Sequence, residues 1–147
     1  MLVFPPASVS KQSLAKAAKK SDAKRITFEG PCFIYRAYDS KIALDMAKIA
    51  KSDNVVTAKQ VSNRFSDIID AIVETGTETI LPGEKFYVKT ILASKKDCVE
   101  RDIEFASAGA LVEKLARINA LPARSEHEAD RVILVVVGKR QAYVGVR

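Results

Sequence analysis

The run Val132-Ile133-Leu134-Val135-Val136-Val137 is apolar throughout and mostly β-branched. Such a run is typical of a strand in the middle of a sheet that is covered on both faces. The next residues, Gly138-Lys139-Arg140-Gln141, predict a turn. Tyr143, Val144 and Val146 predict a last strand beyond that turn. The C-terminal part of the chain is therefore predicted to hold a sheet on which helices pack.

Four elements are expected between residue 61 and this central strand. Ser62 is placed to cap an amphipathic helix that Gly76 would end, because apolar residues recur between them at helical spacing. Lys85–Leu92 is rich in β-formers and predicts a strand. Arg101–Phe105 alternates with period two, which predicts a further strand, and Ser107 is placed to cap a second helix.

The first 60 residues predict a separate small unit. Its expected elements are the strand Leu2–Phe4, the helix Ser10–Lys20, the strands Arg25–Glu29 and Cys32–Tyr38, the helix Ile42–Ile49 and the strand Asn54–Gln60. This β-α-β-β-α-β order is the ferredoxin-like motif. We therefore predict two domains, 1–60 and 61–147, and a fold of the α+β or α/β class.

Composition excludes several classes of protein. The chain has 147 residues, of which 48% are hydrophobic and 29% charged, and this argues against disorder and collagen-like repeats. No apolar run approaches the roughly 20 residues that span a bilayer. The two cysteines, Cys32 and Cys98, lie far apart, and two prolines interrupt the apolar start of the chain. We therefore expect a soluble cytoplasmic protein rather than a secreted or membrane protein.

The positive charge is concentrated in the first unit. The net charge is +6, and residues 1–60 hold 11 basic and 5 acidic residues, whereas 61–147 hold 13 of each. A basic excess favours a polyanionic partner, because each cation that contacts a phosphate releases counterions. Basic residues near Phe86 and Tyr87 suggest a tract for the RNA backbone. The alternative is a solvated, charged sheet edge that discourages aggregation.

No motif of a catalytic site is present. Every glycine is isolated, which excludes a Walker A loop and a G-x-G-x-x-G fingerprint, so we predict no cofactor. The single histidine lies in Glu126-His127-Glu128, which is more typical of a solvated connector than of a metal site. Cys98 has basic neighbours but no histidine or second cysteine beside it. A small enzyme that uses Cys98 or the His127 loop remains the least favoured alternative.

The stretch from Val61 to Arg147 resembles a THUMP domain, the RNA-binding module of 4-thiouridine synthetases, certain RNA methyltransferases and some pseudouridine synthases. The resemblance is carried by the helix after Val61, by Lys85-Phe86-Tyr87-Val88-Lys89, Arg101-Asp102-Ile103-Glu104-Phe105, Ser107, Pro122 and Asp130, by Val132–Val137 and by Ala142-Tyr143-Val144. In thiouridine synthetases a small ferredoxin-like domain precedes this module. The resemblance implies binding of tRNA, or of another structured RNA, at the acceptor stem and 3′ end.

The sequence departs from that family because the expected catalytic domain, with its Ser-Gly-Gly-x-Asp-Ser loop or methyltransferase fold, is absent from these residues. We therefore expect an RNA-binding part that is not itself an enzyme, with any tRNA-modifying enzyme on a separate chain or in a missing domain. The alternatives are an adaptor that docks a catalytic partner, and one that presents tRNA to an acetyltransferase or methyltransferase.

The residues expected to contact RNA are all basic. They are Lys16, Lys19, Lys20, Lys89, Lys95, Lys96, Arg101, Arg124, Lys139 and Arg140. We predict that these contacts go mainly to phosphates and position the RNA without reading much sequence. No metal site and no catalytic residue is predicted, and the sequence leaves the oligomeric state open.

Overall fold

The computed structural model describes residues 2–4, 8–20, 26–30, 32–35, 41, 44–45, 48, 51, 55–94 and 98–147. The chain divides into two compact units, Met1–Thr57 and Ala58–Arg147. Strand β4, Val55–Ser62, contains the boundary between them.

The first unit has a small antiparallel sheet and a helix. Its elements are β1 (Leu2–Val3), α1 (Lys11–Lys20), β2 (Ile26–Glu29), β3 (Cys32–Tyr35) and the start of β4. The strand order is β2-β3-β1-β4, with antiparallel pairing throughout. This order agrees with the predicted ferredoxin-like arrangement. The helix predicted over Ile42–Ile49 lies largely outside the described residues.

A few apolar side chains form the interior of the first unit. Leu14 of α1, Ile34 of β3 and Val56 of β4 are buried. Cys32 is buried with them, and burial, with a smaller contribution from Glu29, raises the pKa of its thiol to about 12. A thiol with so high a pKa stays protonated and unreactive at neutral pH. Cys32 therefore acts as a small core residue.

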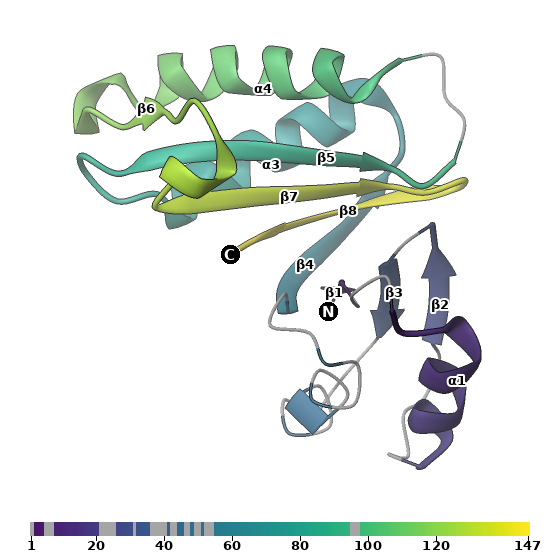
Figure 1. The fold of residues 1–147 in the computed structure, drawn as a ribbon. Coiled ribbons are helices and arrows are strands. Elements are labelled where there is room, and N and C mark those ends of the chain that lie inside the picture. Colours follow the sequence, from purple (N-terminus) through teal and green to yellow (C-terminus); the bar gives the residue numbers. More distant parts are fainter. Residues whose placement is uncertain are drawn as a thin grey trace. The chain divides into compact units, whose positions relative to one another are not determined.

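The second unit is a mixed sheet with two long helices (Figure 1). Its strands are the end of β4, then β5 (Lys85–Leu92), β6 (Leu121–Pro122), β7 (Arg131–Val137) and β8 (Gln141–Val146), in the order β4-β8-β7-β5-β6. The helices are α3 (Phe65–Thr79) and α4 (Glu100–Lys114), and the short 3-10 turns are η1 (Ala116–Ile118) and η2 (Glu126–Glu128). The predicted mixed α/β fold is confirmed.

Strand β7 is buried along both faces, as its unbroken apolar sequence predicts. Ile133, Val135 and Val137 belong to the core cluster formed with α3 and α4. The alternate residues, including Leu134 and Val136, are also buried. β7 pairs in parallel with β5 and antiparallel with β8. The strand that decides the fold therefore lies in the middle of the sheet.

Helix α4 corrects the sequence-based interpretation of residues 101–107. The predicted strand Arg101–Phe105 is wrong, because these residues form the first turns of α4. Ile103, Ser107 and Leu111 are buried at helical spacing, and the Val99 N–H donates to Asp102 Oδ2 at 2.9 Å. The apparent period of two arises because Phe105, although apolar, lies on the solvent side of the helix and is 86% exposed.

Gly76 does not end its helix, since α3 continues to Thr79. It is buried where α3 packs against α4 and the sheet. A Cβ atom at this position would lie 2.4 Å from Leu111 Cδ2 and 3.2 Å from Ile133 Cδ1. The missing side chain therefore permits the close approach of the two helices, which outweighs the poor helix propensity of glycine.

Candidate nucleic-acid interface

A groove between α4 and the edge of β5 brings together two of the predicted cations. Its volume is about 850 Å³, and its lining includes Tyr87, Arg101, Asp102, Glu104, Phe105 and Arg124. Arg101 comes from the first turn of α4, and Arg124 from the connection between β6 and η2. We call this hollow the cationic groove. The sequence predicted both arginines as contacts, and the fold places them at one site.

The groove exists because β5 is an edge strand over most of its length. The partner strand β6 pairs only with Lys85 and Phe86, so the edge beyond Phe86 lacks a neighbouring strand among the described residues. At this edge the Thr90 N–H donates to Glu104 Oε1 at 2.9 Å. The carboxylate of α4 therefore takes the place of a strand partner and fixes the helix against the edge.

The charged groups of the cationic groove differ in whether they already have a hydrogen-bond or ion-pair partner among the described residues. The carboxylates of Asp102 and Glu104 each accept a backbone N–H, from Val99 and Thr90 respectively. Arg101 and Arg124 are exposed, and no carboxylate of the described residues lies within ion-pair distance of either guanidinium. The arginine donors are therefore the groups available to bind an anion.

Phe105 stands at the rim of this groove, one helical turn after Arg101. Its 86% exposure is the highest among the large apolar side chains described. An isolated exposed apolar residue is common, but an exposed aromatic ring beside two arginines that form no ion pair with the described residues offers a face on which a base can stack. The sequence did not indicate this residue, because the period-two pattern predicts that Phe105 belongs to a strand.

A second group of cations lies at the turn between β7 and β8. We call Arg64, Lys139 and Arg140 the hairpin cluster. The side-chain amide of Asn63 donates to the carbonyl oxygens of Gly138 and Lys139, at 3.3 and 2.8 Å. These bonds hold the start of α3 against the turn. They hold the backbone next to Arg64, a residue that the sequence did not indicate, against the turn that carries the predicted Lys139 and Arg140.

Replacing Asn63 by alanine is expected to lower RNA affinity about threefold, because the turn loses the two hydrogen bonds that hold its cations in place. Fluorescence anisotropy with labelled tRNA measures the effect. In the Arg64→Ala/Lys139→Ala/Arg140→Ala background the same substitution should have no further effect, since no cation of the cluster remains to be positioned. An equal loss in both backgrounds would contradict a role through the hairpin cluster.

Lys89 is already engaged by an acid. Its Nζ lies 2.7 Å from Glu126 Oε2, and Glu126 also accepts a hydrogen bond from the Arg147 guanidinium. Partial burial opposes ionisation of Glu126, but these two cations outweigh it and hold the pKa of its carboxyl below the usual value. Lys89 therefore presents less free positive charge than Arg101 or Arg124.

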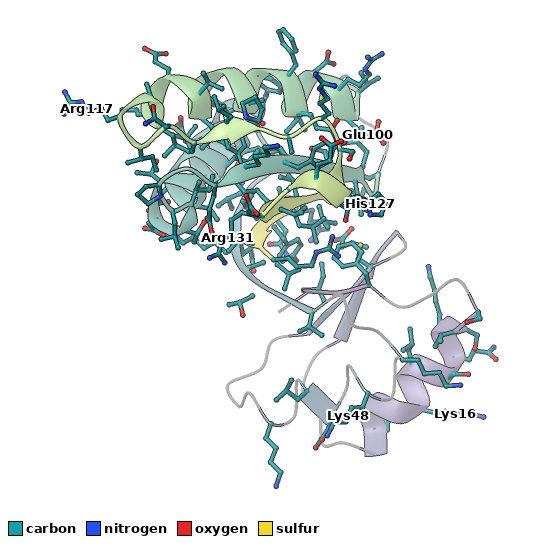
Figure 2. All side chains as sticks on the ribbon, turned by 60° about the vertical axis from the view of Figure 1, so that its left-hand side comes forward. Lys16, Lys48, Glu100, Arg117, His127 and Arg131 are labelled. Atoms are coloured by element: carbon teal, nitrogen blue, oxygen red, sulfur yellow. The ribbon has the colours of Figure 1, made fainter. Side chains whose placement is uncertain are left out.

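The remaining predicted contacts do not all fall within the described structure. Lys16 and Lys19 are exposed on α1 of the first unit, where Figure 2 labels Lys16. Lys20 also belongs to α1. Lys95 and Lys96 lie outside the described residues. The structure thus joins Arg101 with Arg124, and Lys139 with Arg140, and the other predicted contacts stay predictions.

The groups considered for catalysis are not assembled into a site in the described part of the chain. His127 is exposed on η2, and Cys98 packs against the core of the second unit. Among described residues, no three potential metal ligands from histidine, cysteine, aspartate and glutamate cluster together. The helices that the structure describes include none long and apolar enough to cross a membrane.

The fold of the chain is that of a ferredoxin-like unit followed by a THUMP-like α/β unit, and solved structures share it. PH1313 from Pyrococcus horikoshii superimposes with a TM-score of 0.67 at 13% identity, over 99% of this chain and 53% of its own. A 4-thiouridine synthetase solved with RNA and ATP gives a TM-score of 0.69 at 16% identity, over 99% of this chain and 40% of its own. TrmN from Thermus thermophilus gives 0.60 at 13% identity, over 99% and 44%.

The chain thus spans about half the length, or less, of these solved proteins. No protein-family model and no curated protein sequence matches it. At such low identity the likeness establishes the fold alone.

Proposed function

We propose that this protein is a non-catalytic RNA-binding module that recognises the acceptor stem and 3′ end of tRNA. It would serve a tRNA-modifying enzyme, such as one that forms 4-thiouridine, on a separate chain or in a further domain. The observation that carries the proposal is the cationic groove, where Arg101 and Arg124 meet beside the exposed ring of Phe105. A structural neighbour was solved in complex with RNA, which supports the same class of ligand.

The two groups of cations suit two parts of such an RNA. The hairpin cluster consists of three exposed basic side chains, so it fits the phosphates of a duplex. The cationic groove adds Phe105 and the half-buried Tyr87 to its arginines. A hollow with both features fits an unpaired nucleotide, whose phosphate the arginines bind and whose base stacks on the ring. An acceptor stem that ends in single-stranded nucleotides offers both.

The proposal is tested by titrating the full chain with tRNA at several salt concentrations. We expect binding at low salt and a linear fall of log K with log salt, because phosphate contacts release counterions. A tRNA without its single-stranded 3′ nucleotides should bind more weakly. Absence of binding at low salt, or an affinity independent of salt, would overturn the proposal.

Replacing Phe105 by alanine is expected to weaken binding of intact tRNA about tenfold, which is the order of one lost base-stacking contact. Binding of a blunt RNA duplex should change little, because a duplex keeps its bases stacked internally. Anisotropy with both RNAs makes the comparison. Val112→Ala is a suitable control, since Val112 is an exposed apolar residue of α4 outside the cationic groove. Equal losses for both RNAs would rule out stacking.

Replacing Glu126 by glutamine is expected to raise RNA affinity about threefold, because it removes a negative charge and releases Lys89 and Arg147 from it. Glu128→Gln removes the same charge from an exposed neighbour that forms no ion pair with the described residues. Anisotropy at low salt compares the two variants. A larger gain from Glu128→Gln would show that Lys89 does not contribute.

A further inference from the structure

A second groove flanks α4 on the side away from the cationic groove, where α4 faces α3. Its volume is about 620 Å³. The lining includes Ile69 and Val73 of α3 and Ala110 of α4, which are partly buried and supply apolar surface. Ile69 and Val73 also pack against the core of the unit. The floor of this groove is therefore rigid, apolar and open to a ligand.

Carboxylates form the rim of the same groove. Asp70, Glu74 and Glu78 recur at every fourth residue of α3 and so form one row along the helix. Glu113 of α4 also lines the groove. The basic neighbours are fewer: Lys59 pairs with Glu74 at 3.4 Å and with Glu78 at 3.1 Å, and Lys114 lines the groove. We call this hollow the acidic groove.

The two grooves beside α4 select opposite ligands. Phosphates are attracted to Arg101 and Arg124, whereas the carboxylate row repels them. An RNA bound at the cationic groove would leave the acidic groove free. An apolar floor with a carboxylate rim complements a helix that has an apolar stripe flanked by lysine or arginine.

We infer that the acidic groove docks a cationic amphipathic helix of a separate protein. Apolar side chains at i, i+3 and i+7 of that helix would contact Ile69, Val73 and Ala110. Its basic side chains would pair with the carboxylates, of which Asp70 and Glu113 form no ion pair with the described residues. We assign this helix to the tRNA-modifying enzyme, and that assignment rests on the proposed function. The docking surface itself does not depend on it.

The probe is a synthetic helical peptide with leucines at i, i+3 and i+7 spacing, flanked by lysines. It is titrated into the ¹⁵N-labelled full chain, and amide shifts are followed by NMR. We expect saturable shifts confined to α3 and the C-terminal half of α4. A peptide with glutamate in place of lysine, and a scrambled peptide of the same composition, should not produce them. Shifts spread over all acidic surfaces, or equal shifts with the scrambled peptide, would overturn the inference.

Charge reversal locates the interaction. Asp70→Lys/Glu113→Lys is expected to weaken peptide binding about tenfold, and Asp70→Asn/Glu113→Gln should give a smaller loss without new charges. Glu100→Lys/Glu128→Lys makes the same change of net charge outside the groove, and should leave peptide affinity within about twofold. Equal losses in the groove and control variants would refute a specific site.

The same samples separate this inference from the proposed function. tRNA should bind the peptide-saturated protein with unchanged affinity once the binding of the peptide to free tRNA, titrated separately, is subtracted, and competition beyond that would overturn the assignment to a protein ligand. If the protein binds RNA but not the peptide, only this inference is wrong. If it binds the peptide but not RNA, only the RNA-binding proposal is wrong.

A second copy of this chain is the alternative occupant of the acidic groove, because its helix α1 is cationic. Light scattering tests for such a dimer. A salt-sensitive dimer that the peptide dissociates would assign the groove to a second copy and overturn the inference.

Discussion

The double charge reversal Arg101→Glu/Arg124→Glu is expected to lower tRNA affinity about a hundredfold at low salt. Both guanidiniums face the cationic groove, and no described carboxylate lies within ion-pair distance of either of them. Two phosphate contacts are therefore lost, and two repulsive charges replace them. The slope of log K against log salt should become shallower by about two, because two fewer counterions are released.

Anisotropy titrations across a range of salt concentrations measure both quantities. Arg117→Glu/Lys48→Glu is the matched control, because it makes the same change in net charge. Arg117 follows α4 at the end opposite to Glu100, and Lys48 belongs to the first unit (Figure 2). If the control loses as much affinity as the groove variant, RNA responds only to net charge. The cationic groove would then not be the site.

Replacing Phe86 by alanine is expected to reduce the free energy of unfolding of the second unit by about 3–5 kcal/mol, because a large buried side chain leaves a cavity. Phe86 is fully buried, at 0% exposure, at the start of the edge strand β5. Its ring belongs to the core cluster that α3 and α4 form with the sheet. Urea unfolding followed by circular dichroism measures the loss.

Phe105→Ala is the control, since it deletes the same side chain from a solvent-facing position. Its free energy of unfolding should stay within about 0.5 kcal/mol of the unsubstituted protein. If Phe86→Ala does not fold, Phe86→Met keeps most of the volume and should lose less than about 1.5 kcal/mol. A Phe86→Ala variant as stable as Phe105→Ala would contradict the described core.

The elements that sequence reasoning placed correctly are those whose burial follows their apolar pattern, continuous along β7 and alternating along β5. β7 is apolar at every position after Arg131, and β5 has the predicted bounds Lys85–Leu92. The start of α4 was predicted as a strand, because Phe105 mimics an inward-facing residue. The two-residue strand β6 was missed, because it is too short to have a period and depends on pairing with β5.

The candidate site was predictable only in its chemistry. Arg101 and Arg124 were selected as basic residues, but no local pattern indicates that they share a groove. The roles of Asn63 and Arg64 depend on hydrogen bonds to Gly138 and Lys139, which are remote in sequence. The acidic row on α3 is visible as a spacing of four. The opposite wall of the acidic groove comes from α4, and only the tertiary structure places α4 beside this row.

The amino-acid sequence determined which segments are buried and which carry charge, because hydrophobic periodicity and composition are local properties. It thereby defined the central strand β7, the strand β5, the helix that follows Val61 and the cationic character that suggests RNA. Tertiary structure alone decided which charges meet and which are neutralised by neighbours. In the folded unit, helix α4 lies between the groove that contains Arg101 and Arg124 and the groove that contains the carboxylate row. The tertiary structure also left Phe105 exposed while Phe86 is buried. The physical reason is that electrostatic interactions and stacking depend on distances in space, which long-range packing sets.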